Sequence, residues 1–417
     1  MDMSAEQANA DLMVNNLIYK EPQALSLATD KTEKKMFFQR NEYTGDRSTT
    51  MICDWNTGSN FVDVYNSYLS FKVTLTGTTT PTANWGSGSA MNIFNELRIQ
   101  SRSGVECSRD QNVNLWSKYD AFYSKPSTWF ETMGAPQGYG PTQSGAGDAA
   151  NLSATAARFC IPLCELSTFF RPTKGQHIPP QIASGMHMEF VLEDFRTALF
   201  QKSGTVTGYE ISNLFFNLSC VSMSDDTQRS INSESANVGL DYSYERMFAS
   251  ISQVPIGQTT ISLQVRKAVS IANYAYAIAL DAADRIDVTK DSLVSIAFNY
   301  NSWQYRIGSQ WYPHQQVNDA NDGLETYMLA QSTWDKMKHQ YSQGNVSLTR
   351  FKASTGIIAH TFESNSSLSI SGTAINNSRT LELNAEFASV PATLEVITFL
   401  NYSAVAKAFI DNLSVSI

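Results

Sequence analysis

Residues 159–194 read FCIPLCELSTFFRPTKGQHIPPQIASGMHMEFVLED, and this stretch determines the fold that we expect. It starts and finishes with apolar runs of strand character. Pro162 can end the first strand at a sheet edge, because proline donates no hydrogen bond to a neighbouring strand. Phe169 and Phe170 can close the end of a barrel, and the Pro-Pro pair after them favours an extended path. The stretch therefore predicts a chain that leaves one sheet, bends and enters another.

Strand-like runs surround this stretch on both sides. Residues 68–76 (YLSFKVTLT) alternate between apolar and polar side chains, which is the period of two of a half-buried strand. Residues 92–100 and 105–108 flank the turn sequence SRSG and predict a hairpin. Residues 324–340 carry the one longer helical pattern. Further strands are expected at 36–40, 187–192, 209–223, 260–266, 293–299, 303–308, 368–371, 380–383, 394–400 and 409–417.

The composition favours an all-β protein of two domains. The chain has 417 residues, enough for two cores of roughly 200 residues each. Charged residues make up 17%, below the ~25% of typical soluble domains, and Asn, Ser, Thr and Gln take their place. These residues suit turns and strand faces better than helix surfaces. Many short strands without an alternating strand–helix rhythm predict β-sandwiches or barrels.

The pattern divides the chain into four segments. Apolar residues at helical spacing near the start, including Met13 and Leu17, predict a short amphipathic helix that ends before Pro22. The polar run SDDTQRSINSESAN predicts a linker, because it contains almost nothing to bury. Long loops are expected at 76–90 and 133–157. The expected division is an N-terminal helix and arm at 1–34, a first barrel at 35–224, a linker at 225–239 and a second barrel at 240–417.

No arrangement of residues in the sequence indicates an active site. The five histidines are scattered without metal-ligand spacing, and His187, between two methionines, is typical of a structural histidine. The five cysteines form no CxxC pair and are expected to be small buried hydrophobes. The sequence contains no GxSxG, HExxH or P-loop motif. We therefore expect no catalytic, cofactor-binding or metal-binding residues, and no enzyme.

Two segments resemble parts of ligand-binding loops. The Gly-rich residues 133–157 lack the preceding strand and following helix of a phosphate-binding loop. Asp319, Asn321 and Asp322 match part of a calcium loop, but Glu325 comes too early to complete it. We interpret both segments as loops without a ligand.

Charge and hydropathy limit the possible partners. The net charge is −9, and the densest basic cluster, Lys31, Lys34 and Lys35, is too small to package a genome. We therefore expect no sequence-specific nucleic-acid partner. The N-terminus lacks the basic and apolar regions of a secretion signal, and no run approaches 18 apolar residues. The sequence predicts a protein made in its host cell without a secretion signal.

Three regions together resemble one known family. Residues 159–194 are similar to the segment that crosses between sheets in double jelly-roll major capsid proteins of DNA viruses. Residues 95–112 (NELRIQSRSGVECSRDQN) resemble the early hairpin of the first barrel in that family. Residues 371–387 (SGTAINNSRTLELNAEF) resemble the late turn and strand of the second. With the two-barrel layout, the likeness covers most of residues 35–417.

This resemblance implies a fold, an assembly and a location. The fold would be two tandem eight-stranded jelly-roll barrels with long loops and an N-terminal arm. Three chains would form a homotrimeric, pseudo-hexagonal capsomer of an icosahedral capsid, so that the protein would be a structural component of the virion. The loops at 76–90 and 133–157 would form outer towers. The partners implied are other copies of the chain, minor capsid and penton proteins and, through the N-terminal arm, an internal membrane.

Two alternatives remain open at this stage. The first is a virion spike that binds a receptor or a carbohydrate through β-sandwiches, with Trp303, Trp311 and Tyr312 stacking on sugar rings. Against it, the same aromatic residues suit a core or a subunit interface. The second is a glycosidase with a sandwich fold, whose two carboxylates would be paired in space rather than in sequence. No acidic residue has a context that singles it out for that role.

Overall fold

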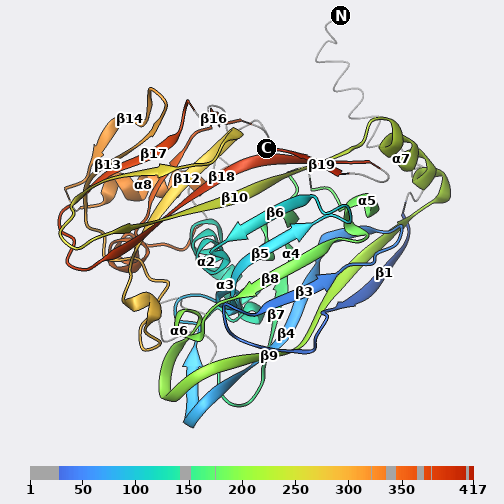
Figure 1. The fold of residues 1–417 in the computed structure, drawn as a ribbon, viewed down its shortest axis with the longest axis horizontal. Coiled ribbons are helices and arrows are strands. Elements are labelled where there is room, and N and C mark those ends of the chain that lie inside the picture. The colour runs from blue at the N-terminus through green and yellow to red at the C-terminus, as the bar shows by residue number, and fades with distance from the viewer. Residues whose placement is uncertain are drawn as a thin grey trace, which may run out of the picture.

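The structure is a computed structural model that describes residues 28–140, 152–173, 175–320, 322–334, 344–363, 371–376, 378–409 and 413–417. Figure 1 shows two strand-rich bodies, one from the blue to green N-terminal half and one from the yellow to red C-terminal half. The helix expected in 1–34 and most of the strand expected at 368–371 lie outside the described residues.

The first half folds into two antiparallel sheets that face each other. One sheet has the order β1-β9-β4-β7, with the short β2 on β9, and the other has the order β3-β8-β5-β6. The ring of Phe190 on β8 lies 5.7 Å from that of Phe38 and 6.2 Å from that of Phe216 on β9, so aromatic side chains fill the space between the sheets. The strands are β1 (Ala28–Phe37), β2 (Glu42–Thr44), β3 (Thr50–Asp54), β4 (Phe61–Asn84), β5 (Phe94–Gln100), β6 (Glu106–Gln111), β7 (Ala157–Pro162), β8 (His187–Leu192) and β9 (Phe200–Met223).

The second half repeats this arrangement. One sheet has the order β10-β18-β12-β15, with β16 on β12 and β19 on β18, and the other has the order β11-β17-β13-β14. The buried Tyr305 of β13 donates from its hydroxyl to the carbonyl of Ile358 in β15, at 3.1 Å, and so joins the two sheets. The strands are β10 (Leu240–Val254), β11 (Thr260–Val265), β12 (Val269–Asp281), β13 (Tyr300–Ile307), β14 (Gln310–Asn318), β15 (Ile358–Thr361), β16 (Thr373–Ile375), β17 (Leu381–Phe387), β18 (Leu394–Ala408) and β19 (Leu413–Ser416).

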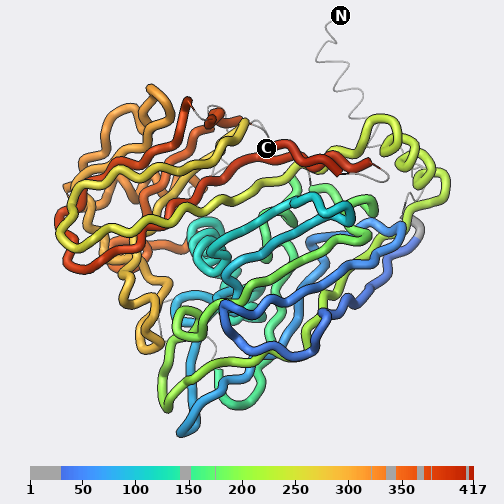
Figure 2. Tube along the Cα trace, viewed as in Figure 1, coloured from blue at the N-terminus to red at the C-terminus, as the bar shows by residue number. Residues whose placement is uncertain are grey.

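Both halves have the strand order of a jelly roll. When the eight main strands of each half are counted in chain order, both halves have one sheet in the order 1-8-3-6 and one in the order 2-7-4-5. The long strands β10 and β18 pair in unbroken register from Leu240 with Ala408 to Val254 with Leu394. In Figure 2 these two strands extend from the second barrel across the first. The predicted fold class, two tandem jelly-roll barrels, is confirmed.

Short helices and turns occupy the connections between the strands. Two of these helices, α2 and α8, occupy equivalent positions, since each lies between the fifth and sixth main strands of its barrel. The helices are α2 (Val113–Ser124), α3 (Ser127–Glu131), α4 (Leu163–Leu166), α5 (Pro180–Ala183), α6 (Phe195–Ala198), α7 (Asp225–Asn237), α8 (Leu324–Trp334) and α9 (Leu348–Arg350). The shorter turns are η1 (Ala90–Ile93), η2 (Ala135–Gln137), η3 (Thr168–Phe170), η4 (Asp284–Ile286) and η5 (Phe351–Thr355).

The stretch 159–194 crosses between the sheets as expected. Its first strand, β7, ends at Pro162 on the edge of one sheet, and its second, β8, lies inside the other. Phe169 and Phe170 are fully buried, and the ring of Phe170 stacks on that of Trp55 at 5.8 Å. The hairpin predicted around residues 101–104 is also present, formed by β5 and β6.

Several expectations about individual segments were wrong. The loop expected at 76–90 is largely strand, because β4 continues to Asn84 and pairs with the start of β9. The strand expected at 293–299 is not a strand, because its backbone makes single hydrogen bonds to separate segments, as Ser295 does to Ser354 and Ile296 does to Ala279. The first barrel's strand β1 begins at Ala28, so the boundary expected at residue 35 falls inside it. The polar run expected as a linker does lie between the two barrels, where it forms the helix α7 between β9 and β10.

Candidate functional site: the contact between the two barrels

Buried hydrogen bonds and charged side chains join the two barrels where they meet. Strand β10 of the second barrel runs beside β6 of the first. The Tyr244 hydroxyl donates to the Cys107 carbonyl at 2.5 Å, and the Tyr242 hydroxyl donates to the Phe169 carbonyl at 2.9 Å. The ring of Phe169 lies 4.9 Å from that of Tyr244, edge to face. Because all four side chains are buried, these contacts hold the two barrels in one orientation.

An ion-pair cluster on the outer surface of the first barrel reaches the same boundary. Its Glu106 lies 3.4 Å from Arg98 of the first barrel and 3.1 Å from Arg246 of the second barrel. Burial alone lowers the pKa of Arg246, but Tyr402, Tyr244, Asp110 and Glu106 outweigh it, so that the net shift is upward. Arg246 therefore stays protonated and links the second barrel to Glu106 of the first.

The helix α2 of the first barrel also contributes to the contact. All of its residues except the last are buried, which is unusual for a connection between strands. Its Tyr123 hydroxyl donates to the Thr355 carbonyl at 2.8 Å, and its Lys118 ammonium donates to the Leu293 carbonyl at 2.5 Å. Both acceptors belong to the second barrel, so α2 is a part of the first barrel that is buried by the second.

Lys118 is a cation with almost no exposure, at 1% of its surface. Burial lowers its pKa most, Asp291 opposes the shift and Arg350 adds to it, so that the net pKa is about 8. The ammonium also lies 5.3 Å from the ring centre of Tyr119. Lys118 is therefore protonated at neutral pH at an energetic cost, which the contact between the barrels must offset.

A second buried charge cluster holds α2 to the first barrel's crossing segment. Arg171 donates to Asp120 of α2 at 2.7 Å and to Glu165 at 3.0 Å. Burial raises the pKa of Asp120, but Arg171 and Lys125 lower it by more, so that the net pKa lies below its ordinary value. Asp120 also accepts a hydrogen bond from the indole of Trp334 in α8, at 3.3 Å. One carboxylate thus joins residues of both barrels.

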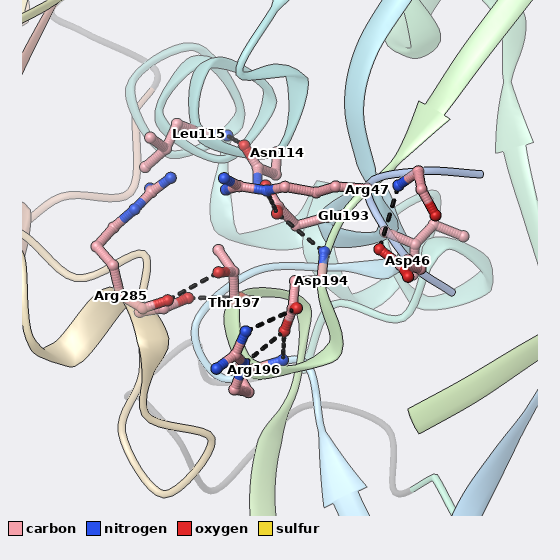
Figure 3. A network of polar contacts seen from close by, with 12 residues as sticks. Asp46, Arg47, Asn114, Leu115, Glu193, Asp194, Arg196, Thr197 and Arg285 are labelled. Carbon is pink, nitrogen blue, oxygen red and sulfur yellow. Dashed lines mark hydrogen bonds and ion pairs between the residues drawn. The ribbon is translucent and has the colours of Figure 1, made fainter. Parts of the chain in front are cut away.

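Figure 3 shows a third network at the opposite end of the contact. Arg47 and Asn114 point toward the buried carboxylate of Glu193, at 2.5 Å and 3.2 Å. The Thr197 hydroxyl donates to the Arg285 carbonyl at 2.7 Å, which ties the first barrel to η4 of the second. The Arg285 side chain is 6% exposed, and burial lowers its pKa. Its Nη1 atom has no hydrogen-bond partner among the described residues.

A cavity of about 490 Å³ lies beside this network. Three arginines line it, but each lies near a carboxylate: Arg47 near Glu193, Arg196 near Asp194 and Arg285 near Glu395. Because these charges are balanced, the lining does not favour an anion over a cation. The cavity is lined by residues of both barrels, such as Asn112 of the first and Gln253 of the second.

The residues singled out in the sequence are dispersed over the structure. The two ring nitrogens of His187 hydrogen-bond to Asp54 at 2.6 Å and to Glu189 at 3.3 Å, so both have partners, as the interpretation as a structural histidine expects. All five cysteines are free, and three of them are buried: Cys53, Cys107 and Cys220. Burial raises the pKa of both Cys53 and Cys107 to about 12, which makes them unreactive.

The segment around Asp319, which resembled part of a calcium loop, begins a helix, whereas residues 141–151 of the Gly-rich segment lie outside the described residues. Asp319 accepts backbone hydrogen bonds from Glu325 and Thr326, each at 3.0 Å, and so caps the start of α8. Within the described residues, no group of three or more His, Cys, Asp or Glu side chains is arranged to hold a metal ion. The same residues include no helix with the length and apolarity to cross a membrane.

The aromatic residues considered for sugar binding do not form one surface. Trp303 is fully buried and donates from its indole to the hydroxyl of Thr326, at 2.6 Å. Trp311 is 38% exposed, with the Arg306 guanidinium 5.3 Å from its ring centre. Trp303 is therefore a core residue, which agrees with the expectation of a core position and not with the expectation of stacking on a sugar ring.

Comparisons with known proteins follow the topology. The fold is that of the double jelly-roll viral major capsid proteins. The PBCV-1 virus capsid protein matches with a TM-score of 0.63 and 11% identity, over 96% of this chain and 99% of that one. The Faustovirus major capsid protein matches with a TM-score of 0.64 and 9% identity, over 96% and 94%. The mavirus major capsid protein matches with a TM-score of 0.53 and 9% identity, over 100% and 96%.

The likeness is one of fold rather than of sequence. No protein-family model matches the chain, and no curated protein matches it. The structural neighbours are capsid proteins rather than enzymes.

Proposed function

We propose that the chain is a viral major capsid protein. Three copies form a homotrimeric, pseudo-hexagonal capsomer, and capsomers tile an icosahedral shell of a DNA virus. The observation that carries this proposal is the tandem repeat of the jelly roll, 1-8-3-6 and 2-7-4-5, over the whole described chain. The solved structures that match this fold over nearly their full lengths are capsid proteins.

The contact between the barrels supports this role. A shell subunit must carry load between its parts without changing shape, and buried hydrogen bonds and charge clusters join these two barrels at several separate points. In this proposal residues 28–224 and 240–417 are the building units of the capsomer, and residues 225–239 join them. The N-terminal arm that precedes β1 faces the interior of the virion.

Other partners follow from the same role. Copies of the chain contact one another within and between capsomers, and minor capsid and penton proteins fill the vertices. The sequence offers the arm as the contact to an internal membrane. The alternative of a receptor- or carbohydrate-binding spike loses support, because Trp303 is a core residue and cannot stack on a ligand.

The proposal is tested by the mass of the purified chain in solution. Size-exclusion chromatography with light scattering should give about three times the chain mass of 46.2 kDa. A species that stays monomeric at high protein concentration would contradict the proposal. A glycan array separates the spike alternative, which predicts binding that is lost in Trp311→Ala.

A further inference from the structure

The guanidinium of Arg285 is buried at the contact between the barrels without a full set of hydrogen bonds. Arg285 lies in η4, between β12 and β13 of the second barrel, and its side chain is 6% exposed. Its Nε atom lies 3.6 Å from the Glu395 carboxylate, which is too far for a hydrogen bond, and its Nη1 atom has no hydrogen-bond partner among the described residues. Because arginine stays protonated and a buried charge is unfavourable without partners, this group favours an added acceptor.

The Arg285 guanidinium lines the cavity of about 490 Å³ between the barrels. Small-molecule sites have volumes of about 300–1,000 Å³, so the cavity can hold a ligand. Apart from Arg285 and Glu395, the charged side chains that line it are held in ion pairs at 2.5 to 2.9 Å: Arg47 with Glu193, Arg196 with Asp194, and Glu96 with Arg109. The lining as a whole is balanced in charge, so the group with incomplete hydrogen bonds decides which ligand binds. That group is a donor, and it calls for an acceptor.

A second guanidinium faces Arg285 from the first barrel. Figure 3 shows the side chains of Arg47 and Arg285 pointing toward each other from the two barrels. Arg47 donates from its Nε atom to Glu193, and its side chain is 52% exposed. Burial lowers the pKa of Arg285, and the carboxylates of Glu395 and Glu193 raise it by less. Arg47 lowers it further, so the two cations repel each other, and an anion between them would relieve this repulsion.

The positions of the two guanidinium groups favour one class of anion. Guanidinium donors match the oxygens of carboxylates and of phosphates. A carboxylate presents its two oxygens on one side, whereas a phosphate group presents oxygens in tetrahedral directions and can accept from both barrels. Neutral amide and hydroxyl side chains around the cavity supply further hydrogen bonds: Asn95, Gln111, Asn112, Thr197 and Gln253.

We propose that the cavity binds a phosphate group, which accepts hydrogen bonds from Arg285 of the second barrel and from Arg47 of the first. The free anion and a small phosphate monoester share this chemistry, and the cavity has room for either. The bound phosphate joins the barrels through an ion, in addition to their direct hydrogen bonds. The proposal does not depend on the capsid function, because the whole site lies within one chain.

Isothermal titration calorimetry of the full chain measures the binding, with inorganic phosphate and ribose 5-phosphate as the two probes. One phosphate group should bind per chain at pH 7, and the melting temperature should rise with its concentration, because the ligand binds the folded state. Sodium chloride at the same ionic strength should not raise it. Tighter binding of ribose 5-phosphate would identify a monoester as the ligand, and equal or weaker binding would identify the free anion. Absence of binding for both probes at about 10 mM would overturn the proposal.

Two variants with opposite expected effects test the residues of the site. Arg285→Met removes the guanidinium with the unpartnered Nη1 atom and should weaken phosphate binding at least about tenfold, because charge-assisted hydrogen bonds are lost. Glu395→Gln removes the carboxylate near Arg285 and should strengthen phosphate binding by about threefold or more. Arg229→Met is the matched control, because this arginine lies on α7 with 80% of its side chain exposed. It removes the same charge and should change the affinity by less than about twofold.

The opposite signs distinguish binding from a general loss of stability. Circular dichroism and thermal melting without phosphate check that each variant is folded. A variant that only destabilises the fold weakens binding, so tighter binding to Glu395→Gln supports the site even if Arg285→Met does not fold. Equal affinities of the unmodified chain and folded Arg285→Met would overturn the assignment, as would weaker binding to folded Glu395→Gln.

Discussion

The outer faces of the two 1-8-3-6 sheets are equivalent surfaces in different surroundings. The face on the second barrel, with Tyr276 and Phe399, is called the covered face, and the face on the first barrel, with Phe37 and Phe215, is called the open face. Both lie on the outer side of a 1-8-3-6 sheet, yet Tyr276 on the one is fully buried and Phe37 on the other is 67% exposed. The first barrel covers one of them, and the described residues cover the other incompletely. The difference shows that the aromatic residues of the covered face are buried by a contact between the barrels, whereas those of the open face are not fully buried by the described residues.

The largest expected effect contrasts an aromatic residue on each face. Tyr276→Ala should destabilise the chain by about 4 kcal/mol, because it leaves a cavity between β12, β18 and Trp334. Phe37→Ala should change the stability of the isolated chain by less than about 0.5 kcal/mol. Urea unfolding of both variants, followed by tryptophan fluorescence at low protein concentration, measures the contrast. Equal losses would mean that the two faces are not distinguished by burial.

Removal of the cation in the buried charge cluster should have the next largest effect. Arg171→Met removes the guanidinium that pairs with Asp120 and Glu165, whose side chains are only 11% and 12% exposed, and leaves Glu165 with Lys125 alone. Breaking such a pair costs about 3 kcal/mol. Arg196→Met is the matched control, because its ion pair with Asp194 lies near the surface, with the arginine 49% exposed, and should cost less than about 1 kcal/mol. Thermal melting of the two variants compares them directly.

Lys118 should make the contact between the barrels depend on pH. Its pKa of about 8 lies below the ~10.4 of an unfolded lysine, so the unfolded chain binds the extra proton between these values. This group therefore destabilises the fold at pH 7 by about 2–3 kcal/mol, and the cost disappears as the pH rises from 8 to 10. Lys118→Met removes the dependence. The difference between the urea midpoints of the two proteins should change between pH 7 and pH 9.5.

The same comparison cancels the opposing effect of the cysteines. Burial raises the pKa of Cys53 and Cys107, so that both proteins lose stability as the pH rises above about 9. A constant difference between the chain and Lys118→Met across this range would show that Lys118 is not a buried cation.

The smallest effect is expected at His187, on the outer surface of the first barrel. Partial burial lowers its pKa, but the hydrogen bonds to Asp54 and Glu189 raise it by more, so the net pKa lies above its ordinary value. The stabilisation is present below about pH 6.5 and is lost as the pH rises through the folded pKa. Because the side chain is partly exposed, the gain is less than about 1 kcal/mol. His187→Gln should lower the melting temperature at pH 5 and not at pH 8.

The fold could be predicted from the sequence where one face of an element is buried and the other is exposed to solvent. The hairpin at 95–112 and the crossing at 159–194 show this, because their turns and prolines are local signals. The strand β12 was missed, since YAYAIAL is buried on both faces and does not alternate. The helix α2 was missed for the same reason: a second body buries its polar side, including Lys118 and Asp120.

The contact between the barrels was not predictable from local pattern. It depends on pairs far apart in the chain, such as Lys118 with Leu293 and Tyr244 with Cys107. In sequence, Lys118 and Asp120 are typical of a solvated surface. A single sequence gives only an indirect indication of this contact. An aromatic residue such as Tyr274, in a run that does not alternate between apolar and polar residues, indicates that another part of the structure covers it.

The most direct test of the account is an electron micrograph of the purified, unmodified chain. Negative-stain class averages should show hexagonal blocks with threefold symmetry, because three copies then present six barrels in one ring. Averages that show only separate two-lobed particles at high protein concentration would contradict the account.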